Sequence, residues 1–299
     1  MRSFAARQGL APSDASACWW RCAPGTFPDA WLGSSSAAPA TLAPAPSLDP
    51  SPEPAPAPAA GADEPAGAGA APAPLRVAVL GGTFNPPTHA HLMLVAQALA
   101  SGRADEVWLV PCGPRADKAG VGLSCAARTA LTALAVEAAF PCEPRVRTMP
   151  LELREPSALA SADLFARLEH AAAARRSGSG RAVHFSLVLG MDCMGGLGAW
   201  RHPARLLADV RFLVCPRPGY ERPPPGAPWP RQAAVLGGLQ CLVLSSSEVR
   251  RRAAGARGGA GGGGGSGGGG GAQAAVAAAL DGLVHAPVAA LIANAGLYV

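Results

Sequence analysis

The sequence predicts an α/β fold in which a parallel β-sheet is flanked by helices, and three observations support this. Short apolar runs typical of buried strands alternate with stretches whose apolar residues recur at helical spacing. The first of these runs, Val77 to Leu80, leads through a glycine-containing turn directly into a helix. Later strands end in loops that carry glycine and charged residues, which is where ligands bind in open parallel sheets.

The turn after the first strand predicts an anion-binding site. Gly81 and Gly82 end the strand, and the prolines at 86–87 force an extended turn that cannot be helical. A helix is expected from about His89. Its free N–H groups and its dipole favour negative charge. Thr88 and His91 are three residues apart and share one face of the first turn, whereas His89 should point elsewhere.

Residues 82–91 also carry a resemblance, since they read GTFNPPTHAH. This run resembles the signature of the nucleotidyltransferase superfamily, in the form found in nicotinamide/nicotinate mononucleotide adenylyltransferases. The resemblance implies a Rossmann-like nucleotidyltransferase fold, with Thr88 and His91 as catalytic residues. It also implies that Gly82, Thr83 and Phe84 bind the nucleotide. An ordinary strand–turn–helix corner with two surface histidines is the alternative.

Composition divides the 299 residues into two parts. Residues 1–74 are dominated by Ala, Pro, Ser and Gly, so we expect a disordered extension that buries too little to fold. Residues 75–299 are long enough for one domain with a sizeable core. Within it, 258–271 is nearly all glycine and is expected to be a flexible insertion.

Charge points to an anionic ligand. Residues 1–74 hold three basic and six acidic residues, whereas 75–299 hold 22 basic and 14 acidic ones. No dense basic stripe is interleaved with aromatic residues, so small phosphorylated ligands are favoured over nucleic acid. The eight cysteines form no C-x-x-C pair, so neither a protein metal site nor a disulfide framework is expected.

The expected location is the cytoplasm. No apolar run approaches the ~20 residues that a membrane span requires. An organelle is the alternative if residues 1–74 include a transit peptide, because their first part carries a few arginines.

The remaining elements follow from periodicity and from turn residues. Expected strands are 105–111, 146–153, 182–189, 210–215 and 239–244. Expected helices are 124–140, 161–174 and 204–208, and one that starts after Ser245. Residues 283–298 resemble the family's C-terminal helix, and Leu297-Tyr298 resemble its closing L-Y.

The loop after the second strand contains Lys118, the only lysine in the chain. A loop in this position faces the glycine turn, so Lys118 is a candidate phosphate ligand, and a solvated loop lysine is the alternative. Related adenylyltransferases also carry an arginine where Arg128 stands, and a structural role is at least as well supported as ligand contact. Relatives usually have Thr and an aromatic residue where this chain has Ser161 and Ala162, so its preference between nicotinate and nicotinamide is left open.

Gly190, Asp192 and Trp200 follow the strand 182–189. Glycine permits close approach at a strand end, and a carboxylate just beyond it suits ribose hydroxyls. The spacing resembles the family's G-x-D…W pattern, which implies that Asp192 binds the ribose and Trp200 stacks on the pyridine ring. A core tryptophan and a helix-capping aspartate are the alternatives.

A second anion site is expected near Ser245, which has capping-box spacing to Glu248. Arg250 lies one turn into the helix as a forked phosphate donor. This stretch resembles the superfamily's S-S-T-x-[IV]-R motif, with Ser247 in place of Thr, and implies that Ser246, Ser247 and Arg250 bind phosphate, with Arg250 catalytic. Residues 216–219 resemble the family's R-P-G ending of the preceding strand.

The resemblance implies an enzyme of NAD biosynthesis that transfers AMP from ATP, with Mg²⁺, to a pyridine mononucleotide. Catalysis would rest on positioning and charge stabilisation, without a protein nucleophile. Two alternatives remain, namely another adenylyl- or cytidylyltransferase and a non-catalytic nucleotide-binding module. No nucleic-acid or membrane partner is expected, and homo-oligomerisation is left open.

Overall fold

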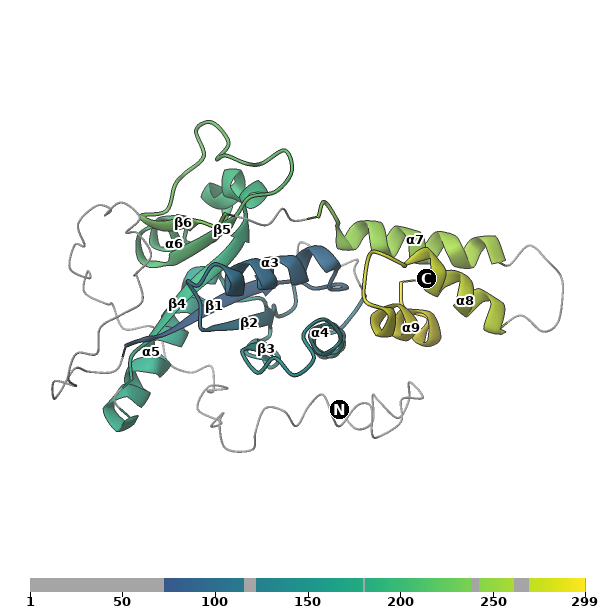
Figure 1. The fold of residues 1–299 in the computed structure, drawn as a ribbon, viewed down its shortest axis with the longest axis horizontal. Coiled ribbons are helices and arrows are strands. Elements are labelled where there is room, and N and C mark those ends of the chain that lie inside the picture. The colour runs from purple at the N-terminus through teal and green to yellow at the C-terminus, as the bar shows by residue number, and fades with distance from the viewer. Residues whose placement is uncertain (1–72, 116–121, 180, 238–241, 261–268, 299) are drawn as a thin grey trace, which may run out of the picture.

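The computed structural model of the protein describes residues 73–115, 122–179, 181–237, 242–260 and 269–298 (Figure 1). All but the last two residues of the extension expected at 1–74 lie outside the described residues. The same holds for Lys118 and for residues 261–268 of the glycine-rich tract.

The described chain contains a six-stranded parallel sheet with the order β3-β2-β1-β4-β5-β6. Its strands are β1 (Leu75–Gly82), β2 (Glu106–Pro111), β3 (Val146–Thr148), β4 (Val183–Gly190), β5 (Arg211–Cys215) and β6 (Gln232–Val235). The order reverses between β1 and β4, and this switch point is where open parallel sheets bind ligands. The predicted Rossmann-like fold is therefore confirmed.

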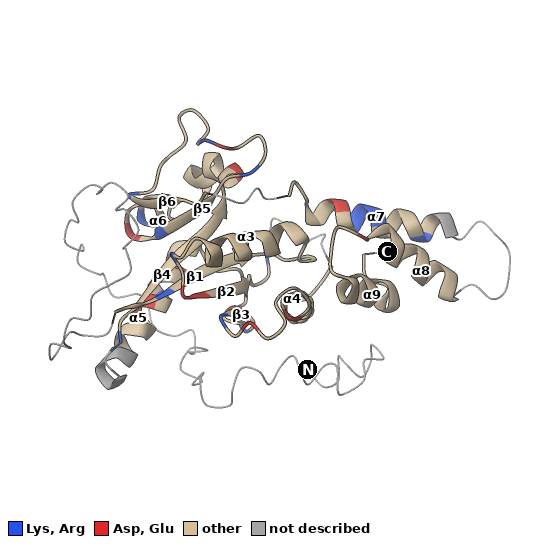
Figure 2. Ribbon diagram, in the orientation of Figure 1, with Lys and Arg blue, Asp and Glu red and all other residues tan. Residues whose placement is uncertain are grey.

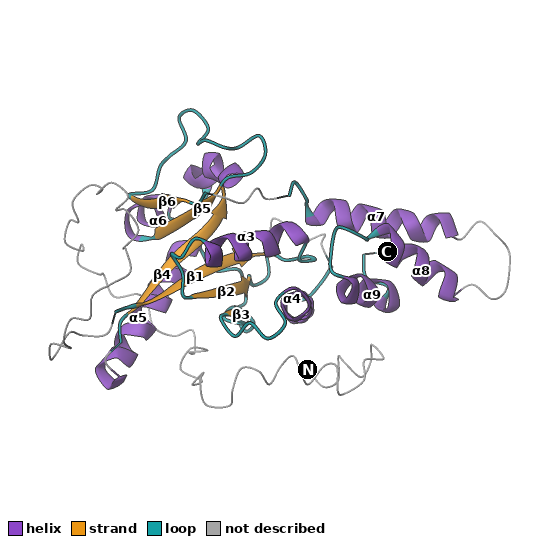
Figure 3. Cartoon of the chain, viewed as in Figure 1, coloured by secondary structure: helices purple, strands orange, loops and turns teal. Residues whose placement is uncertain are grey.

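Helices cover both faces of this sheet (Figure 3). They are α3 (His89–Ala100), α4 (Cys125–Ala139), α5 (Ser161–Ser179), the 3₁₀ helix η3 (Met191–Ala199), α6 (Pro203–Asp209), α7 (Ser246–Ala260), α8 (Gly269–Ala279) and α9 (Ala286–Ala295). Two starts follow the predicted caps. Ser124 accepts the N–H of Ala127 at 3.1 Å, and Ser245 accepts that of Glu248 at 3.2 Å.

The core lies in two layers because successive strand side chains point to opposite faces. Ala78 and Leu80 of β1 pack in one cluster with residues of α3, α4 and the C-terminal helices α7–α9. Val77 and Val79 pack in the other, with residues of α5, η3 and α6. Burial on both faces explains why β1 is continuously apolar rather than alternating.

Two predicted strands differ from the structure. The strand expected at 146–153 ends at Thr148, because Pro150 cannot donate to a ladder and the chain turns there, with the Leu151 N–H bonded to the Met149 carbonyl at 2.9 Å. The last strand in the described chain is β6, which precedes the strand expected at 239–244 and lies at the edge of the sheet. Residues 238–241 lie outside the described part, and 242–244 are not strand.

Helix lengths differ from the predictions in smaller ways. Helix α5 continues beyond 174 to Ser179, and α6 gains one residue at each end. The ends of the glycine tract are also not linker, because residues 258–260 complete α7 and 269–271 begin α8. Among the helices that the structure describes, none is both long and apolar enough to cross a membrane.

Candidate active site

The turn between β1 and α3 is built around Phe84. Its side chain is buried, and its backbone φ of 45° lies in the left-handed region, which non-glycine residues seldom adopt. The ring packs closely over Gly82, where an added Cβ would lie 3.0 Å from it. It also meets the His91 ring edge-on at 5.2 Å between centroids. Any side chain at position 82 would press on the buried Phe84 ring, which fills the inside of the turn.

Helix α3 starts at His89 as predicted, with Thr88 as its N-cap. The Thr88 backbone N–H donates to His91 Nδ1 at 3.0 Å, and the Thr88 hydroxyl lies 2.8 Å from the same nitrogen. Because Nδ1 accepts, a neutral His91 carries its proton on Nε2. Thr88 is fully buried, so the structure places it as the group that orients His91.

His91 is held in its neutral form. Burial, and then the nearby positive charge of Arg217, lower the pKa of its imidazole from 6.5 to about 4. The neighbouring His89 instead meets the His285 ring at 4.5 Å between centroids, next to the start of α9. Near neutral pH the site thus offers a fixed Nε2–H donor rather than an imidazolium.

The second predicted anion motif lies directly on this turn, although it is far away in the sequence. Ser246 donates from its hydroxyl to the Pro86 carbonyl at 2.8 Å. Arg250 donates to the Asn85 carbonyl at 2.8 Å and to the Ser247 hydroxyl at 3.0 Å. The N-termini of α3 and α7 are joined by these bonds into one site.

Arg250 is the arginine of its turn that faces the site. The next two, Arg251 and Arg252, are exposed and are both paired with Glu248, at 2.6 and 2.8 Å. Figure 2 shows acidic and basic residues close together in the first part of α7. Their charges are thus partly neutralised at the surface, whereas the Arg250 guanidinium is bonded to the turn.

Asp192 and Gly190 lie at the end of β4, the other strand of the switch point. Asp192 Oδ2 accepts from Arg217 at 2.8 Å, while its Oδ1 is buried with no hydrogen-bond partner among the described residues. A Cβ on Gly190 would lie 2.3 Å from that Oδ1, so a side chain here would have to displace the Asp192 carboxylate. Arg217 also donates to the Leu242 carbonyl at 2.9 Å.

Arg217 was not among the predicted site residues. The signal for it was the run Arg217-Pro218-Gly219 after β5, which was noted only as a resemblance. The structure brings Arg217 to Asp192 and close enough to His91 to lower the pKa of that imidazole.

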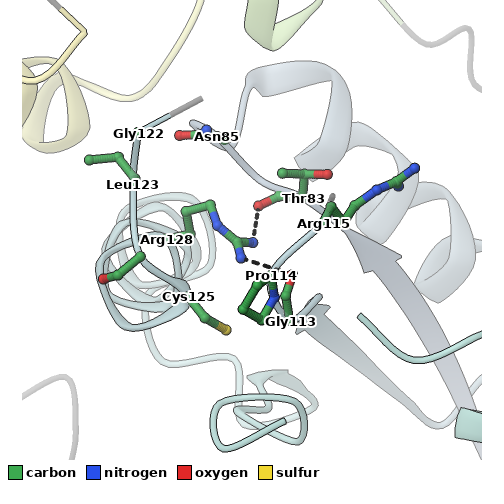
Figure 4. Close-up of a pocket in the computed structure, with 10 residues that line it drawn as sticks. Thr83, Asn85, Gly113, Pro114, Arg115, Gly122, Leu123, Cys125 and Arg128 are labelled. Atoms are coloured by element: carbon green, nitrogen blue, oxygen red, sulfur yellow. Dashed lines mark hydrogen bonds between the residues drawn. The ribbon is translucent and has the colours of Figure 1, made fainter. Parts of the chain in front are cut away.

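A cavity of about 380 Å³ adjoins the turn (Figure 4). Its lining includes Thr83, Asn85, Arg115 and Arg128. Residues 116–121, which include Lys118, are outside the described part of the chain. Because the lining joins the turn to Arg128 of α4, the cavity can receive a group that extends from the anion site towards α4.

Arg128 has a structural role here. It is 4% exposed and donates to the carbonyls of Thr83 at 2.7 Å and Cys112 at 2.6 Å, which clamps the loops after β1 and β2 together. Nearby, the buried Glu152 carboxylate accepts the N–H groups of Gly113 at 2.8 Å and Leu159 at 2.9 Å. Sequence reasoning missed Glu152, which has no periodic or motif signal.

Trp200 is half-buried and packs partly against the core cluster of α5, η3 and α6. It ends the 3₁₀ helix that begins next to Asp192, so η3 links the two predicted mononucleotide residues. Ser161 and Asp163 begin α5. Asp163 accepts from Arg205 of α6 at 3.1 Å, which ties the two helices together.

The fold and the site define an α/β protein whose parallel sheet presents one composite anion site at its switch point. The cytidylyltransferase-like family model matches residues 79–252, and the chain belongs to that family. The superfamily resemblance of its motifs is thereby confirmed.

Several relatives share the name "probable nicotinate-nucleotide adenylyltransferase". The one from Bordetella petrii is 28% identical over 228 residues, which cover 75% of this chain and 98% of that relative. The one from Anaeromyxobacter dehalogenans is 30% identical over 162 residues, or 51% of this chain and 75% of the relative. The match to the Chromohalobacter salexigens relative, 30% identical, covers 50% of this chain and spans only 63% of that relative.

A solved structure has the same fold. It is Plasmodium falciparum nicotinic acid mononucleotide adenylyltransferase complexed with NaAD, with a TM-score of 0.56 and 17% identity over 75% of this chain and 97% of that one.

Proposed function

We propose that this protein transfers the adenylyl group of ATP to a pyridine mononucleotide, yielding NAD or its deamido form and pyrophosphate. One observation carries the proposal. The carbonyls of Asn85 and Pro86 accept hydrogen bonds from Arg250 and Ser246, so two phosphate-binding motifs form one site next to His91. The names of the relatives support nicotinate mononucleotide as the first substrate to test.

The reaction needs no protein nucleophile. An oxygen of the mononucleotide phosphate attacks the α-phosphorus of ATP and forms a new P–O bond. The bond between the α-phosphorus and the oxygen that bridges the α- and β-phosphates breaks, and pyrophosphate leaves with that oxygen. His91 Nε2–H and the Arg250 guanidinium donate to the phosphate oxygens as charge shifts towards the leaving group. The free N–H groups at the start of α3 and the backbone of Gly82 and Thr83 hold the triphosphate.

The mononucleotide occupies the β4 side of the switch point. Asp192 Oδ1, which has no hydrogen-bond partner in the described part of the chain, accepts from a ribose hydroxyl, and Arg217 adds positive charge for an anionic group. Trp200 stacks on the pyridine ring. Phe84 keeps the turn in shape, while Ser246, Ser247 and Lys118 complete the phosphate contacts.

Mg²⁺ is carried by ATP in this proposal. The described residues contain no group of three His, Cys, Asp or Glu side chains that could hold a metal ion. Mg²⁺ commonly binds largely through substrate phosphates and water, which fits a site whose lining is rich in cationic and N–H donors. When bound, it neutralises charge on the triphosphate.

The direct test is pyrophosphate release by the full-length protein with ATP and Mg²⁺, given nicotinate mononucleotide, nicotinamide mononucleotide or neither. We expect release that depends on a pyridine mononucleotide, with the matching dinucleotide as product. His91→Ala serves as the control for a contaminating activity. A folded protein that forms no dinucleotide from either substrate would overturn the proposal. ATP binding without turnover would instead indicate a non-catalytic module, and turnover only with another phosphorylated acceptor would indicate a different transferase.

A further inference from the structure

The C-terminal end of the chain reaches the catalytic turn through Tyr298. Its phenolic hydroxyl donates to the Asn85 side-chain oxygen at 2.5 Å, across 213 residues of sequence. Asn85 is 2% exposed and belongs to the turn between β1 and α3. This contact therefore fixes a buried side chain of the phosphate site.

Asn85 connects Tyr298 to Arg250. Its backbone carbonyl accepts from Arg250 at 2.8 Å, and Arg250 also donates to the Ser247 hydroxyl at 3.0 Å. The hydroxyl of Tyr298, the amide and carbonyl of Asn85, and the guanidinium of Arg250 thus form one connected series. Moving Asn85 would shift the carbonyl that sets the direction of Arg250.

The chain end is shaped to deliver this tyrosine. Helix α9 ends at Gly296 in the left-handed conformation (φ 60°), and the Leu297 N–H bonds back to the Ile292 carbonyl at 3.0 Å. Tyr298 itself has a φ of 66°, a region that non-glycine residues seldom adopt. An added Cβ at Gly296 would lie 2.8 Å from the Arg257 guanidinium of α7, so the chain end packs against α7 as well.

The environment keeps the phenol a donor. Burial raises the pKa of Tyr298, and the positive charges of Arg250 and Arg128 oppose this rise only in part. The hydroxyl stays protonated near neutral pH and can donate to the Asn85 oxygen.

We propose that Tyr298 is a positioning residue of the active site, whose hydroxyl holds Asn85 so that Arg250 is aimed at the reacting phosphates before substrate binds. The proposal deepens the proposed function and rests on it. Tyr298 touches no substrate and acts through Asn85 and Arg250.

The test compares Tyr298→Phe with Tyr220→Phe. The chain has two tyrosines, and Tyr220 is 46% exposed, so its variant is a matched control. In Tyr298→Phe we expect kcat to fall ~10-fold or more while KM for ATP changes much less, because misdirection of Arg250 affects the transition state most. Tyr220→Phe should keep the wild-type kcat.

A double-mutant cycle with Asn85→Ala then asks whether Tyr298 acts through Asn85. Adding Tyr298→Phe to Asn85→Ala should cost no further turnover. Losses that add fully would overturn the inference. So would a KM for ATP that rises as much as kcat falls, or a loss of kcat matched by loss of folded protein at the assay temperature.

A measurement independent of turnover uses Tyr220→Phe, in which Tyr298 is the remaining tyrosine. In a pH titration, the absorbance of the Tyr298 tyrosinate should appear only at a pH well above 10, the approximate pKa of an ordinary tyrosine. Ionisation of Tyr298 near pH 10 would overturn the inference. An inactive wild type would overturn the proposed function, whereas an active wild type equalled by Tyr298→Phe would overturn this inference alone.

Discussion

His91 and His89 lie two residues apart at the start of α3 and differ in what they contact. His91 accepts from Thr88 and keeps an Nε2–H donor beside the phosphate turn, whereas His89 packs on His285. We expect His91→Ala to lower kcat by ~10²–10³, with a smaller change in KM, because a positioned donor acts mostly in the transition state. His89→Ala should stay within a few-fold of wild type in the same steady-state assay. A dead His89 variant would show that the donor has been assigned to the wrong histidine.

The depressed pKa of His91 makes stability depend on pH. Its pKa is about 4 in the substrate-free fold and near 6.5 when unfolded, so the unfolded chain binds more protons between these values. The free energy of unfolding should therefore fall as pH drops from 6.5 towards 4, by up to ~1.4 kcal/mol per pH unit from this group. Burial and nearby His89 lower the pKa of His285 as well, so its contribution has the same sign.

Urea unfolding at several pH values in this window tests the assignment to His91. His91→Ala should show a flatter dependence than wild type, while His170→Ala, on the exposed side of α5, should not. Equal slopes in wild type and His91→Ala would contradict a neutral, buried His91.

Trp200 should matter for one substrate more than for the other. If its ring stacks on the pyridine, Trp200→Ala should weaken mononucleotide binding by about 1–3 kcal/mol, the usual range for stacking on an aromatic side chain. ATP binding should change less. Calorimetric titration with each ligand separates the two effects, and equal losses would indicate damage to the core cluster against which Trp200 packs.

Among the elements, the loops after β1, β2 and β3 depend on buried polar groups. Glu152 accepts the N–H groups of Gly113 and Leu159, and burial raises the pKa of its carboxyl. Glu152→Ala would leave both donors without this acceptor, which typically costs 1–3 kcal/mol for each buried group. We expect an unfolding free energy lower by about 2 kcal/mol or more. Glu152→Gln keeps an acceptor oxygen and should lose less, so equal losses in urea melts would argue against these bonds.

The sequence predicted best those elements whose pattern is local. β1, the start of α3 at His89 and the Ser124 cap follow from adjacent residues, and all are found as expected. The edge strand was missed because Gln232–Val235 is short and weakly apolar, while the more apolar 239–244 stretch attracted the prediction. Edge strands are decided by neighbours in space, and here β5 is the neighbour.

In the candidate site, too, the local motifs could be predicted from the sequence and the contacts between distant residues could not. Its two phosphate motifs were visible as runs of residues, but their junction was not. The bonds from Arg250 and Ser246 to the carbonyls of Asn85 and Pro86 join residues at least 160 positions apart. Glu152 reaches the site only through tertiary contacts, so no spacing rule could point to it. Arg217 and Tyr298 lie in runs that resemble the family's, but their contacts with Asp192 and Asn85 could not be read from those runs.

At the scale of the whole molecule, the first element of the described fold is β1, which begins at Leu75. The Leu75 N–H bonds to the Ala182 carbonyl at 2.8 Å, and the Ala73 carbonyl accepts from Arg181 at 2.8 Å, so these two contacts help to secure the start of β1. Composition predicts that residues 1–74 are a separate extension, because we expect an Ala- and Pro-rich stretch to bury too little apolar surface to offset its ordering entropy.

A chain that starts at Ala73 should keep the unfolding free energy and the kcat/KM of the full-length protein within error. Shortening residues 261–268 should also be tolerated, since loop closure entropy changes slowly with length, provided that the turns of α7 and α8 at 258–260 and 269–271 are kept. Deleting all of 258–271 should be worse, because it removes helical residues whose neighbours Ala253 and Val276 are buried in the core. Urea melts and initial rates of the three variants test this order. A folded 73–299 protein without activity would assign the extension a role in catalysis.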